Sequence, residues 1–287
     1  MPKAAGIDWN QDRIILGAGE YVANEPIVID HEAGYLGAVQ IIGSGQSETL
    51  LHGTGDFPVI HALEPVSLHN LRVTGPDANG GTGLLMRHGY IGALTEDVVF
   101  ENLRRGIDIE GPYGYPKVVH FAQIHRTTFN QIGEYGIHIP YGHHCQQIVG
   151  CNFIVGPNAA SIYLDYVSGI VIERCLFLVP RSPSIVLRGS YSIQIHNCGF
   201  DGSYSPGIDI GDTGPGYPDI GIPANYPAKA IFISGLQWVH DDASPGAGIR
   251  ARNVRGLYLR DNFVVQEPLA DVDGSVTDFH ESGTVAL

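Results

Sequence analysis

Acidic residues and a histidine occupy matching places in a series of short segments that alternate apolar and polar residues. The series reads Gly-Ile-Asp-Ile-Glu from residue 106, Gly-Ile-His-Ile-Pro from 136, Ser-Ile-Tyr-Leu-Asp from 161, Ser-Ile-Val-Leu-Arg from 184 and Gly-Ile-Asp-Ile-Gly from 207. Such alternation is typical of short strands, with the isoleucines on one face and the residues between them facing solvent. The solvent-facing positions include four candidate catalytic residues: Asp108, Glu110, His138 and Asp165. Carboxylates and imidazoles are side chains that exchange protons with a substrate.

The spacing of neighbouring strands predicts how far apart these side chains lie. At ~4.8 Å per strand, Asp108 and His138 become direct neighbours, as a general base and the group that holds it would be. Glu110 and Asp165 lie two strands apart, ~9.6 Å, close to the upper limit of roughly 6.5–9.5 Å used by inverting glycosidases. Asp209 lies four strands from Asp108, ~19 Å, too far to join the same reaction. The alternative is that these residues form an ordinary polar ladder on a surface.

Aromatic residues near these segments suit the binding of a sugar. Two long turns, 111–117 and 140–147, flank the acidic positions and are rich in tyrosine and histidine. Loops on a rigid scaffold often carry binding sites, and aromatic faces stack on sugar rings. The candidate substrate-binding residues are Tyr113, Tyr115 and Tyr141 in the turns, and Tyr163 and Arg188 in the outward rows. Tyr163 is also a candidate proton donor.

The histidines and cysteines do not predict a metal site. His143, His144 and Cys145 follow His138 closely, but no carboxylate has the spacing of a known metal site. The four cysteines, Cys145, Cys151, Cys175 and Cys198, fit no zinc template. No glycine-rich element precedes a helix, so a nucleotide cradle is unsupported. We therefore expect neither a metal nor a cofactor.

A second repeat, six residues long, predicts the fold. Its copies read Leu-His-Asn-Leu-Arg-Val from 68, Phe-Glu-Asn-Leu-Arg-Arg from 100, Ile-His-Arg-Thr-Thr-Phe from 124, Ile-Val-Gly-Cys-Asn-Phe from 148, Ile-Glu-Arg-Cys-Leu-Phe from 172 and Ile-His-Asn-Cys-Gly-Phe from 195. The starts from 100 to 195 differ by 24, 24, 24 and 23 residues, with weaker copies from Ile233 and Leu259. Two short strands with corners in each such period predict one coil of an all-β solenoid, in which stacked coils share a continuous core. Equivalent residues then form ladders: an apolar ladder of Cys151, Cys175 and Cys198, and an aromatic stack of Phe129, Phe153, Phe177 and Phe200.

The opening segments carry a resemblance to a known superfamily. Residues 13–21, Arg-Ile-Ile-Leu-Gly-Ala-Gly-Glu-Tyr, are followed by Pro-Ile-Val-Ile and by Val-Gln-Ile-Ile-Gly-Ser-Gly at 39–45. The chain resembles the pectate-lyase-like right-handed β-helix superfamily, which includes phage tailspikes, polysaccharide lyases and epimerases. The resemblance implies a single-stranded right-handed parallel β-helix over residues 1–265, including an N-terminal cap. We expect residues 266–287, which are acidic and lack the repeat, to form a C-terminal tail or cap.

The chain departs from the enzymes of that superfamily. The lyases use Lys or Arg to neutralise a uronate and abstract its proton. The only lysines in this chain are Lys3, Lys117 and Lys229. The Asp-Pro-His arrangement of mannuronan epimerases is absent from the sequence. These departures weaken the lyase and epimerase interpretations without excluding them.

Charge and hydropathy limit the partners. The 30 acidic residues exceed the 16 basic ones and give a formal net charge of -14, which repels nucleic acid. No apolar run predicts a membrane span, and no secretory signal follows Met1. We expect the protein in a virion, or secreted by a route that the sequence does not reveal.

Three functions remain open. The first is a virion-associated β-helix protein, tailspike-like or a capsid decoration, forming a homo-oligomer (a trimer), contacting other virion proteins and binding a surface polysaccharide. The second is a glycoside hydrolase, lyase or epimerase that uses the carboxylate and histidine cluster. The third is a structural solenoid without a ligand.

Overall fold

Short strands make up almost all of the regular structure. The structure, a computed structural model, describes residues 13–30, 39–87, 93–109, 122–140, 144, 146–178, 182–202, 206–211, 226–239, 248–265 and 269–286. Four predicted site residues lie outside these ranges: Glu110, Tyr113, Tyr115 and Tyr141. Within the described residues there is no helix, and every strand pairs in parallel with the equivalent strand one coil away.

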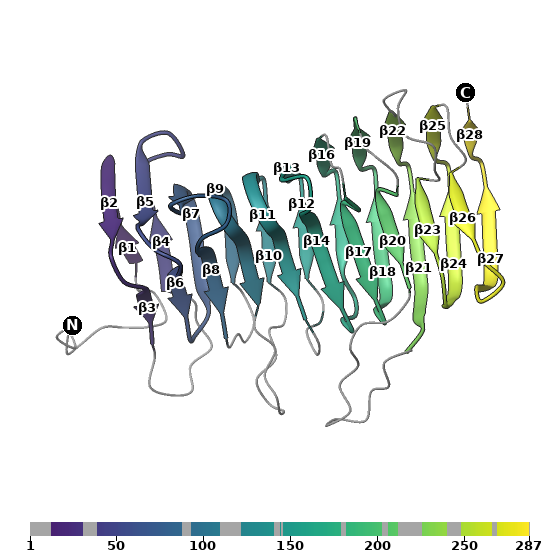
Figure 1. The fold of residues 1–287 in the computed structure, drawn as a ribbon, viewed down its shortest axis with the longest axis horizontal. Coiled ribbons are helices and arrows are strands. Elements are labelled where there is room, and N and C mark those ends of the chain that lie inside the picture. Colours follow the sequence, from purple (N-terminus) through teal and green to yellow (C-terminus); the bar gives the residue numbers. More distant parts are fainter. Residues whose placement is uncertain are drawn as a thin grey trace.

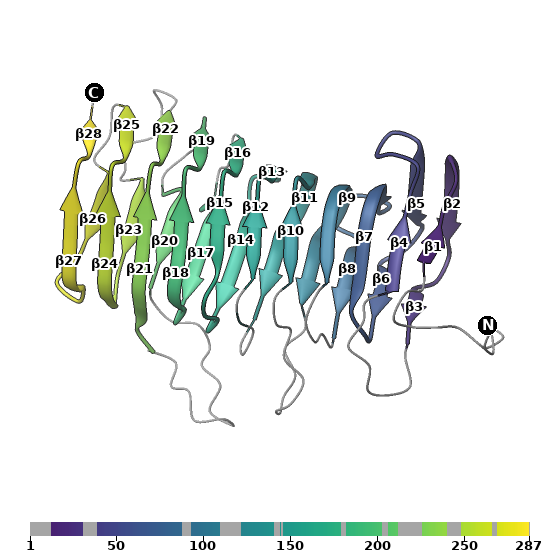
Figure 2. The same ribbon diagram turned by 180° about the vertical axis from the view of Figure 1, so that it is seen from behind.

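The strands form three parallel sheets that run along one axis, from β1–β3 at one end to β26–β28 at the other (Figures 1 and 2). The first sheet contains β1 (Arg13–Ile15), β4 (Val39–Ile42), the start of β7 (Val66–Thr74), the start of β9 (Leu94–Ile109), β10 (Gln123–His125), β12 (Gln147–Val149), β15 (Val171–Glu173), β18 (Tyr191–His196), β21 (Ala228–Ser234), β24 (Val254–Arg260) and β27 (Thr277–Ser282). The second contains β2 (Gly19–Ala23), β5 (Thr49–Gly53), later parts of β7 and β9, the start of β11 (Thr128–Ile139), β13 (Asn152–Val155), β16 (Leu176–Leu178), β19 (Gly199–Asp201), β22 (Gln237–Val239), β25 (Phe263–Val265) and β28 (Val285–Ala286). The third contains β3 (Ile27–Ile29), β6 (Pro58–Ala62), β8 (Thr82–Met86), the ends of β9 and β11, β14 (Ala160–Asp165), β17 (Ile185–Arg188), β20 (Ile208–Ile210), β23 (Ile249–Ala251) and β26 (Ala270–Val272). This arrangement is a parallel β-helix, as the repeat predicts.

The six-residue repeat forms the corner between the first and second sheets. Its third residue has a positive φ, for example 45° at Arg126, 65° at Gly150, 54° at Arg174 and 53° at Asn197. A single residue in this left-handed conformation turns the chain sharply, which glycine and asparagine tolerate best. The fourth and sixth residues then point inward and are buried, for example Cys151 and Phe153.

The copy of this repeat assigned to residues 100–105 is wrong. The structure pairs Ile124 with Thr95, and Phe129 with Phe100, so the true copy spans 95–100. Phe100 is therefore the last residue of its repeat instead of the first. The pattern conceals this register because Thr95 stands where the later copies have isoleucine.

The aromatic stack and the cysteine ladder are confirmed. Five contacts, with ring centroids 5.4, 4.9, 5.0, 4.7 and 4.2 Å apart, run in order through Phe100, Phe129, Phe153, Phe177, Phe200 and Trp238. Beside this stack, Cys151, Cys175 and Cys198 are buried free thiols on successive coils. Their neighbouring thiols and burial raise the pKa of Cys175 and Cys198, so both are neutral apolar side chains.

The acidic segment at the end of the chain contains strands. β26, β27 and β28 pair in parallel with β23, β24 and β25, and Val276 packs against the core. Residues 270–286 therefore form a further coil of the stack.

Candidate functional site

The outer face of the third sheet brings the predicted residues into rows. His138 pairs with Asp108 and with Tyr163, as the strand spacing predicts. The row continues through Val186 and Asp209, and then through Arg250 and Asp271. A second row pairs Asp165 with Arg188. The face therefore presents polar side chains from β9 to β26.

Asp108 is the centre of a hydrogen-bonded group at one end of this face. Its Oδ1 lies 2.7 Å from Nδ1 of His138, and its Oδ2 accepts a bond of 2.6 Å from Nη1 of Arg105. Burial raises the pKa of Asp108, but the bond and charge of His138 and Arg105 outweigh that effect and hold it below its ordinary value. Asp108 is therefore a carboxylate that orients an imidazole and a guanidinium.

Arg105 was missed by the sequence reasoning. Besides Asp108 it contacts Glu134, with 2.7 Å from Nε to Oε2 and 2.9 Å from Nη2 to Oε1. This paired geometry fixes a guanidinium firmly. Strict alternation would place Arg105 on the face opposite Asp108, so the sequence pattern contained no signal for it; Arg105 joins the site because the pairing of β9 and β11 is irregular there.

An aromatic cluster, consisting of Tyr135, His138 and Tyr163, lies beside this group. The ring centroids of Tyr135 and His138 are 5.0 Å apart, those of Tyr135 and Tyr163 are 5.2 Å apart, and those of His138 and Tyr163 are 5.6 Å apart. Tyr135 was also missed, since it precedes the alternating segment. Burial raises the pKa of both tyrosines, so their hydroxyl groups stay protonated and can donate hydrogen bonds.

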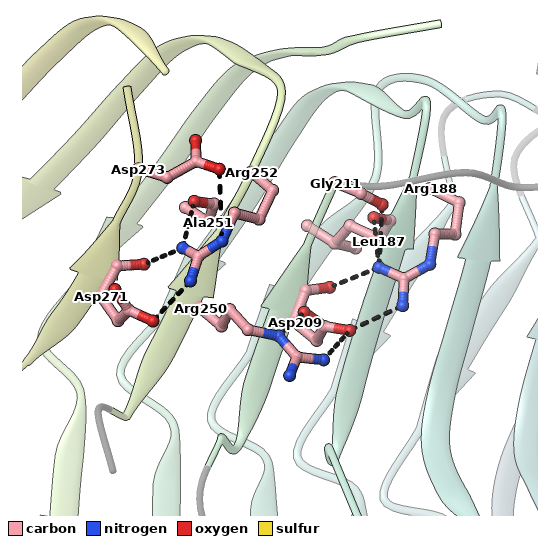
Figure 3. A network of polar contacts seen from close by, with 9 residues as sticks. All are labelled: Leu187, Arg188, Asp209, Gly211, Arg250, Ala251, Arg252, Asp271 and Asp273. Carbon is pink, nitrogen blue, oxygen red and sulfur yellow. Dashed lines mark hydrogen bonds and ion pairs between the residues drawn. The ribbon is translucent and has the colours of Figure 1, made fainter. Parts of the chain in front are cut away.

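Three arginines form a second group further along the same face (Figure 3). We call Arg188, Arg250 and Arg252 the arginine cluster. Arg188 and Arg250 both bond to Asp209, at 2.6 Å and 2.8 Å, and Arg252 bonds to Asp271 at 2.6 Å. Arg188, predicted to bind substrate, is thus mostly engaged with Asp209 and, at 2.9 Å, with the carbonyl of Gly211.

Comparison with known proteins identifies the fold family. Residues 64–218 match the family model of the right-handed β-helix region. The chain belongs to this right-handed β-helix family. The prediction of a right-handed parallel β-helix is therefore confirmed. No curated protein matches the chain.

Solved structures of similar shape include viral proteins and an enzyme. An alginate lyase from Paenibacillus sp. str. FPU-7 has a TM-score of 0.62 and 12% identity, over 95% of this β-helix protein and 92% of the lyase. The tailspike gp49 of Acinetobacter baumannii bacteriophage Fri1, a capsular polysaccharide depolymerase, has a TM-score of 0.62 and 13% identity, over 95% of this chain and 52% of the tailspike. ORF18 of Geobacillus virus E2 has a TM-score of 0.55 and 12% identity, over 99% of this chain and 54% of that chain. The β-helix protein thus spans about half the length of the two viral chains, and these likenesses show a shared fold.

The outward positions of the β-helix protein are less exposed than alternation predicts. Asp108, Asp165 and Asp209 each expose only 4% of their surface, and Val186 exposes 6%. The expectation that these residues face solvent freely is wrong for all four. Long neighbouring side chains, such as Arg105 over Asp108 and Arg188 over Asp209, cover the short ones. Burial leaves Asp165 poorly placed to meet a large substrate directly.

The remaining predicted residues divide into two sets. Glu110, Tyr113, Tyr115 and Tyr141 lie outside the described residues, so the Glu110–Asp165 separation stays a prediction. Among the described residues, no group of three or more His, Cys, Asp or Glu side chains could hold a metal ion. The same part of the chain contains no helix with the length and apolar character of a membrane span.

Proposed function

We propose that this chain is a virion-associated, tailspike-like β-helix protein that binds a surface polysaccharide on the outer face of its third sheet. The observation that carries the proposal is the aromatic cluster, held on consecutive strands β11 and β14 of a rigid scaffold. Aromatic rings with polar tips suit sugars, because ring faces cover C–H groups while hydroxyl groups make hydrogen bonds. The viral proteins of similar shape support the setting.

Polysaccharide binding is tested with the purified protein and a panel of acidic and neutral bacterial capsular polysaccharides. We expect at least one to bind, and Tyr135→Ala or Tyr163→Ala to weaken that binding about tenfold, or ~1.4 kcal/mol. The matched control is Tyr191→Ala, because Tyr191 is a 40%-exposed tyrosine on β18, in the first sheet. Equal losses for Tyr135→Ala and Tyr191→Ala would remove the aromatic cluster from the proposal. A panel without any binding polysaccharide would favour a structural solenoid.

The proposed function includes two kinds of partner in the virion. The protein forms a homo-oligomer, specifically a trimer, and it contacts other virion proteins. Light scattering across a range of concentrations measures the mass of the assembly directly. A stable monomer at every concentration would contradict the trimer, while leaving the polysaccharide site to the binding test.

A second candidate function is polysaccharide cleavage, favoured by the bond between Asp108 and His138. Because Nδ1 of His138 faces Asp108, Nε2 is the nitrogen left to exchange a proton with a ligand. Tyr163, 5.6 Å away between ring centroids, would be the partner acid, and Arg105 would offset negative charge.

Cleavage is followed through new reducing ends and through the absorbance of unsaturated uronates. Reducing ends without absorbance indicate hydrolysis, and added absorbance indicates a lyase. We expect His138→Ala to abolish either signal, and His280→Ala, an exposed histidine on β27, to retain it. Turnover that survives in His138→Ala would show that His138 is not the proton carrier.

A further inference from the structure

The arginine cluster lines a hollow in the outer face of the third sheet. Such a group of basic residues is unusual in so acidic a chain. The hollow has a volume of about 370 Å³ and is lined by Arg188, Asp209, Arg250 and Arg252. The whole chain carries 16 basic residues against 30 acidic ones. Three of the 16 basic residues therefore line one hollow.

Asp209 holds two of these guanidinium groups in place. Its Oδ1 accepts a bond from Nε of Arg250, and its Oδ2 accepts bonds from Nη2 of Arg250 at 2.9 Å and Nη2 of Arg188 at 2.6 Å. Burial acts to raise the pKa of Asp209, but the bonds from Arg250 and Arg188 prevail and lower it, so the residue stays charged. A buried carboxylate thus orients the arginines without occupying the hollow.

Arg250 is the member that remains available to a ligand. Its side chain is 46% exposed, against 16% for Arg188 and 25% for Arg252. Among the described residues, Nη1 of Arg250 has no partner, since only Nε and Nη2 bond to Asp209. A guanidinium fixed on one edge and open on the other can bind an incoming carboxylate with little loss of conformational freedom.

The charges around the arginine cluster limit the way in which an anion can bind there. Arg188, Arg250 and Arg252 are balanced by Asp209, Asp271 and Asp273, which contact them at 2.6 to 3.3 Å. A neutral set of ion pairs provides no long-range attraction for a polyanion. It can accept a single carboxylate through directed hydrogen bonds, as a guanidinium commonly does.

The hollow lies along the same outward row of the third sheet as Tyr163 of the aromatic cluster. Tyr163 on β14 is followed along the row by Val186 on β17, Asp209 on β20 and Arg250 on β23. Three strand spacings, ~14 Å, therefore separate Tyr163 from Arg250, a span that a short oligosaccharide can bridge. Arg188 lies between the two groups, because it pairs with Asp165 on β14 and bonds to Asp209 on β20.

We infer that the arginine cluster is the carboxylate subsite of the polysaccharide-binding face, and that the ligand is an acidic polysaccharide with a uronate at Arg250. This inference rests on the proposed polysaccharide binding and adds its chemical class. The aromatic cluster stacks on the sugar rings, while Arg250 selects chains that carry a carboxylate. The half-buried guanidinium of Arg250 selects the carboxylate through hydrogen bonds. This also explains how an acidic protein binds an acidic ligand.

The test compares an acidic polysaccharide with the same polymer after its carboxyl groups have been reduced to alcohols. The probes are polygalacturonate, alginate and the uronate-containing capsular polysaccharides of the panel, each with its reduced counterpart. We expect the wild-type protein to bind an acidic form at least tenfold more tightly than the reduced form. Arg250→Ala lowers the affinity for the acidic form to that for the reduced form, and leaves the reduced form unaffected.

Arg255→Ala is the matched control, because Arg255 lies on β24 in the first sheet and is exposed. It retains the preference for the acidic form. Arg250→Lys keeps the charge without the planar fork and loses part of that preference. Circular dichroism of each variant checks that the β-helix fold is kept.

Each outcome separates the inference from the proposed function. Equal binding of acidic and reduced forms, with loss in Tyr135→Ala, overturns the carboxylate subsite and supports polysaccharide binding. Wild-type affinity of Arg250→Ala for the acidic form overturns the role of Arg250. Failure of the wild-type protein to bind any acidic or reduced polymer overturns both.

Discussion

Gly207 lies directly against the indole of Trp238, so that a Cβ added to Gly207 would be only 2.0 Å from Cη2 of the ring. Gly207 occupies the corner before β20, and Trp238 ends the aromatic stack that begins at Phe100. The same contact recurs at the other end of the stack, where a Cβ on Gly83 would lie 2.4 Å from Phe100. Small residues at this corner thus make room for the aromatic ladder.

Gly207→Ala should therefore destabilise the protein by overpacking. We expect the free energy of unfolding to fall by about 1–3 kcal/mol, measured by denaturant titration. Gly274→Ala is the control, because a Cβ at Gly274 meets no atom within 4 Å, and its effect should be below ~0.5 kcal/mol. Equal stability of the two variants would show that the stack shifts to accept the methyl group.

Arg174→Gly should stabilise the corner between the first and second sheets. Arg174 has φ 54°, and its side chain is 71% exposed, so little packing is lost. Removing the Cβ relieves a strain of roughly 1–2 kcal/mol, partly offset by the greater freedom of glycine in the unfolded chain.

The expected gain for Arg174→Gly is about 0.5–1 kcal/mol in the free energy of unfolding. Arg260→Gly provides the comparison, because Arg260 is an exposed residue at the end of β24 with no left-handed conformation to relieve. It should lower the stability by about 0.5–1 kcal/mol. A loss of stability in Arg174→Gly would mean that its contact with Glu173 outweighs the backbone strain.

The thiol groups of Cys151, Cys175 and Cys198 should resist alkylation in the folded protein. All three are buried, and Cys175 and Cys198 have raised pKa values, so the reactive thiolate is scarce. Mass spectrometry after iodoacetamide treatment should show modification of these three cysteines only after denaturation. Labelling of Cys175 under native conditions would contradict the closed core.

Acid should destabilise the protein through Asp108 and Asp209. Both carboxyl groups have pKa values below the ordinary value of 3.8 when folded. Their contribution is fully present well above that value, and it is lost as the pH falls through the lower, folded pKa. The melting temperature should therefore drop at strongly acidic pH.

Asp209→Asn should reduce this acid sensitivity and also lower the stability at neutral pH, because Arg188 and Arg250 lose their shared partner. Glu20→Gln, which removes a charge from the exposed strand β2, is the control for net charge. An unchanged acid transition in Asp209→Asn would assign the transition to other carboxyl groups.

The pattern of amino acids alone predicts the stack of coils and the neighbours along its regular stretch. The copies that start at 124, 148, 172 and 195 predict coils of nearly equal length. Aligning the alternating segments by their isoleucines then places Ile137 beside Ile107 and His138 beside Asp108, although the members of each pair are 30 residues apart. The cysteine ladder and the aromatic stack follow from the same regularity. Where the pattern was degenerate, at Thr95, the assigned register slipped by five residues.

The three-dimensional structure was needed to show which polar groups meet and which are covered by their neighbours. Arg250 bonds to Asp209 although the two residues are 41 positions apart, an interval that differs from the repeat. The repeat cannot predict such an interval, because it contains no information on the length of a loop. Arg105 and Tyr135 join the site through irregular positions in the pairing of β9 and β11. Alternation assigns a residue to the outer face, but its exposure depends on the side chains that fold across it. That is why Asp108, Asp165 and Asp209 are outward in the sequence pattern and buried in the structure.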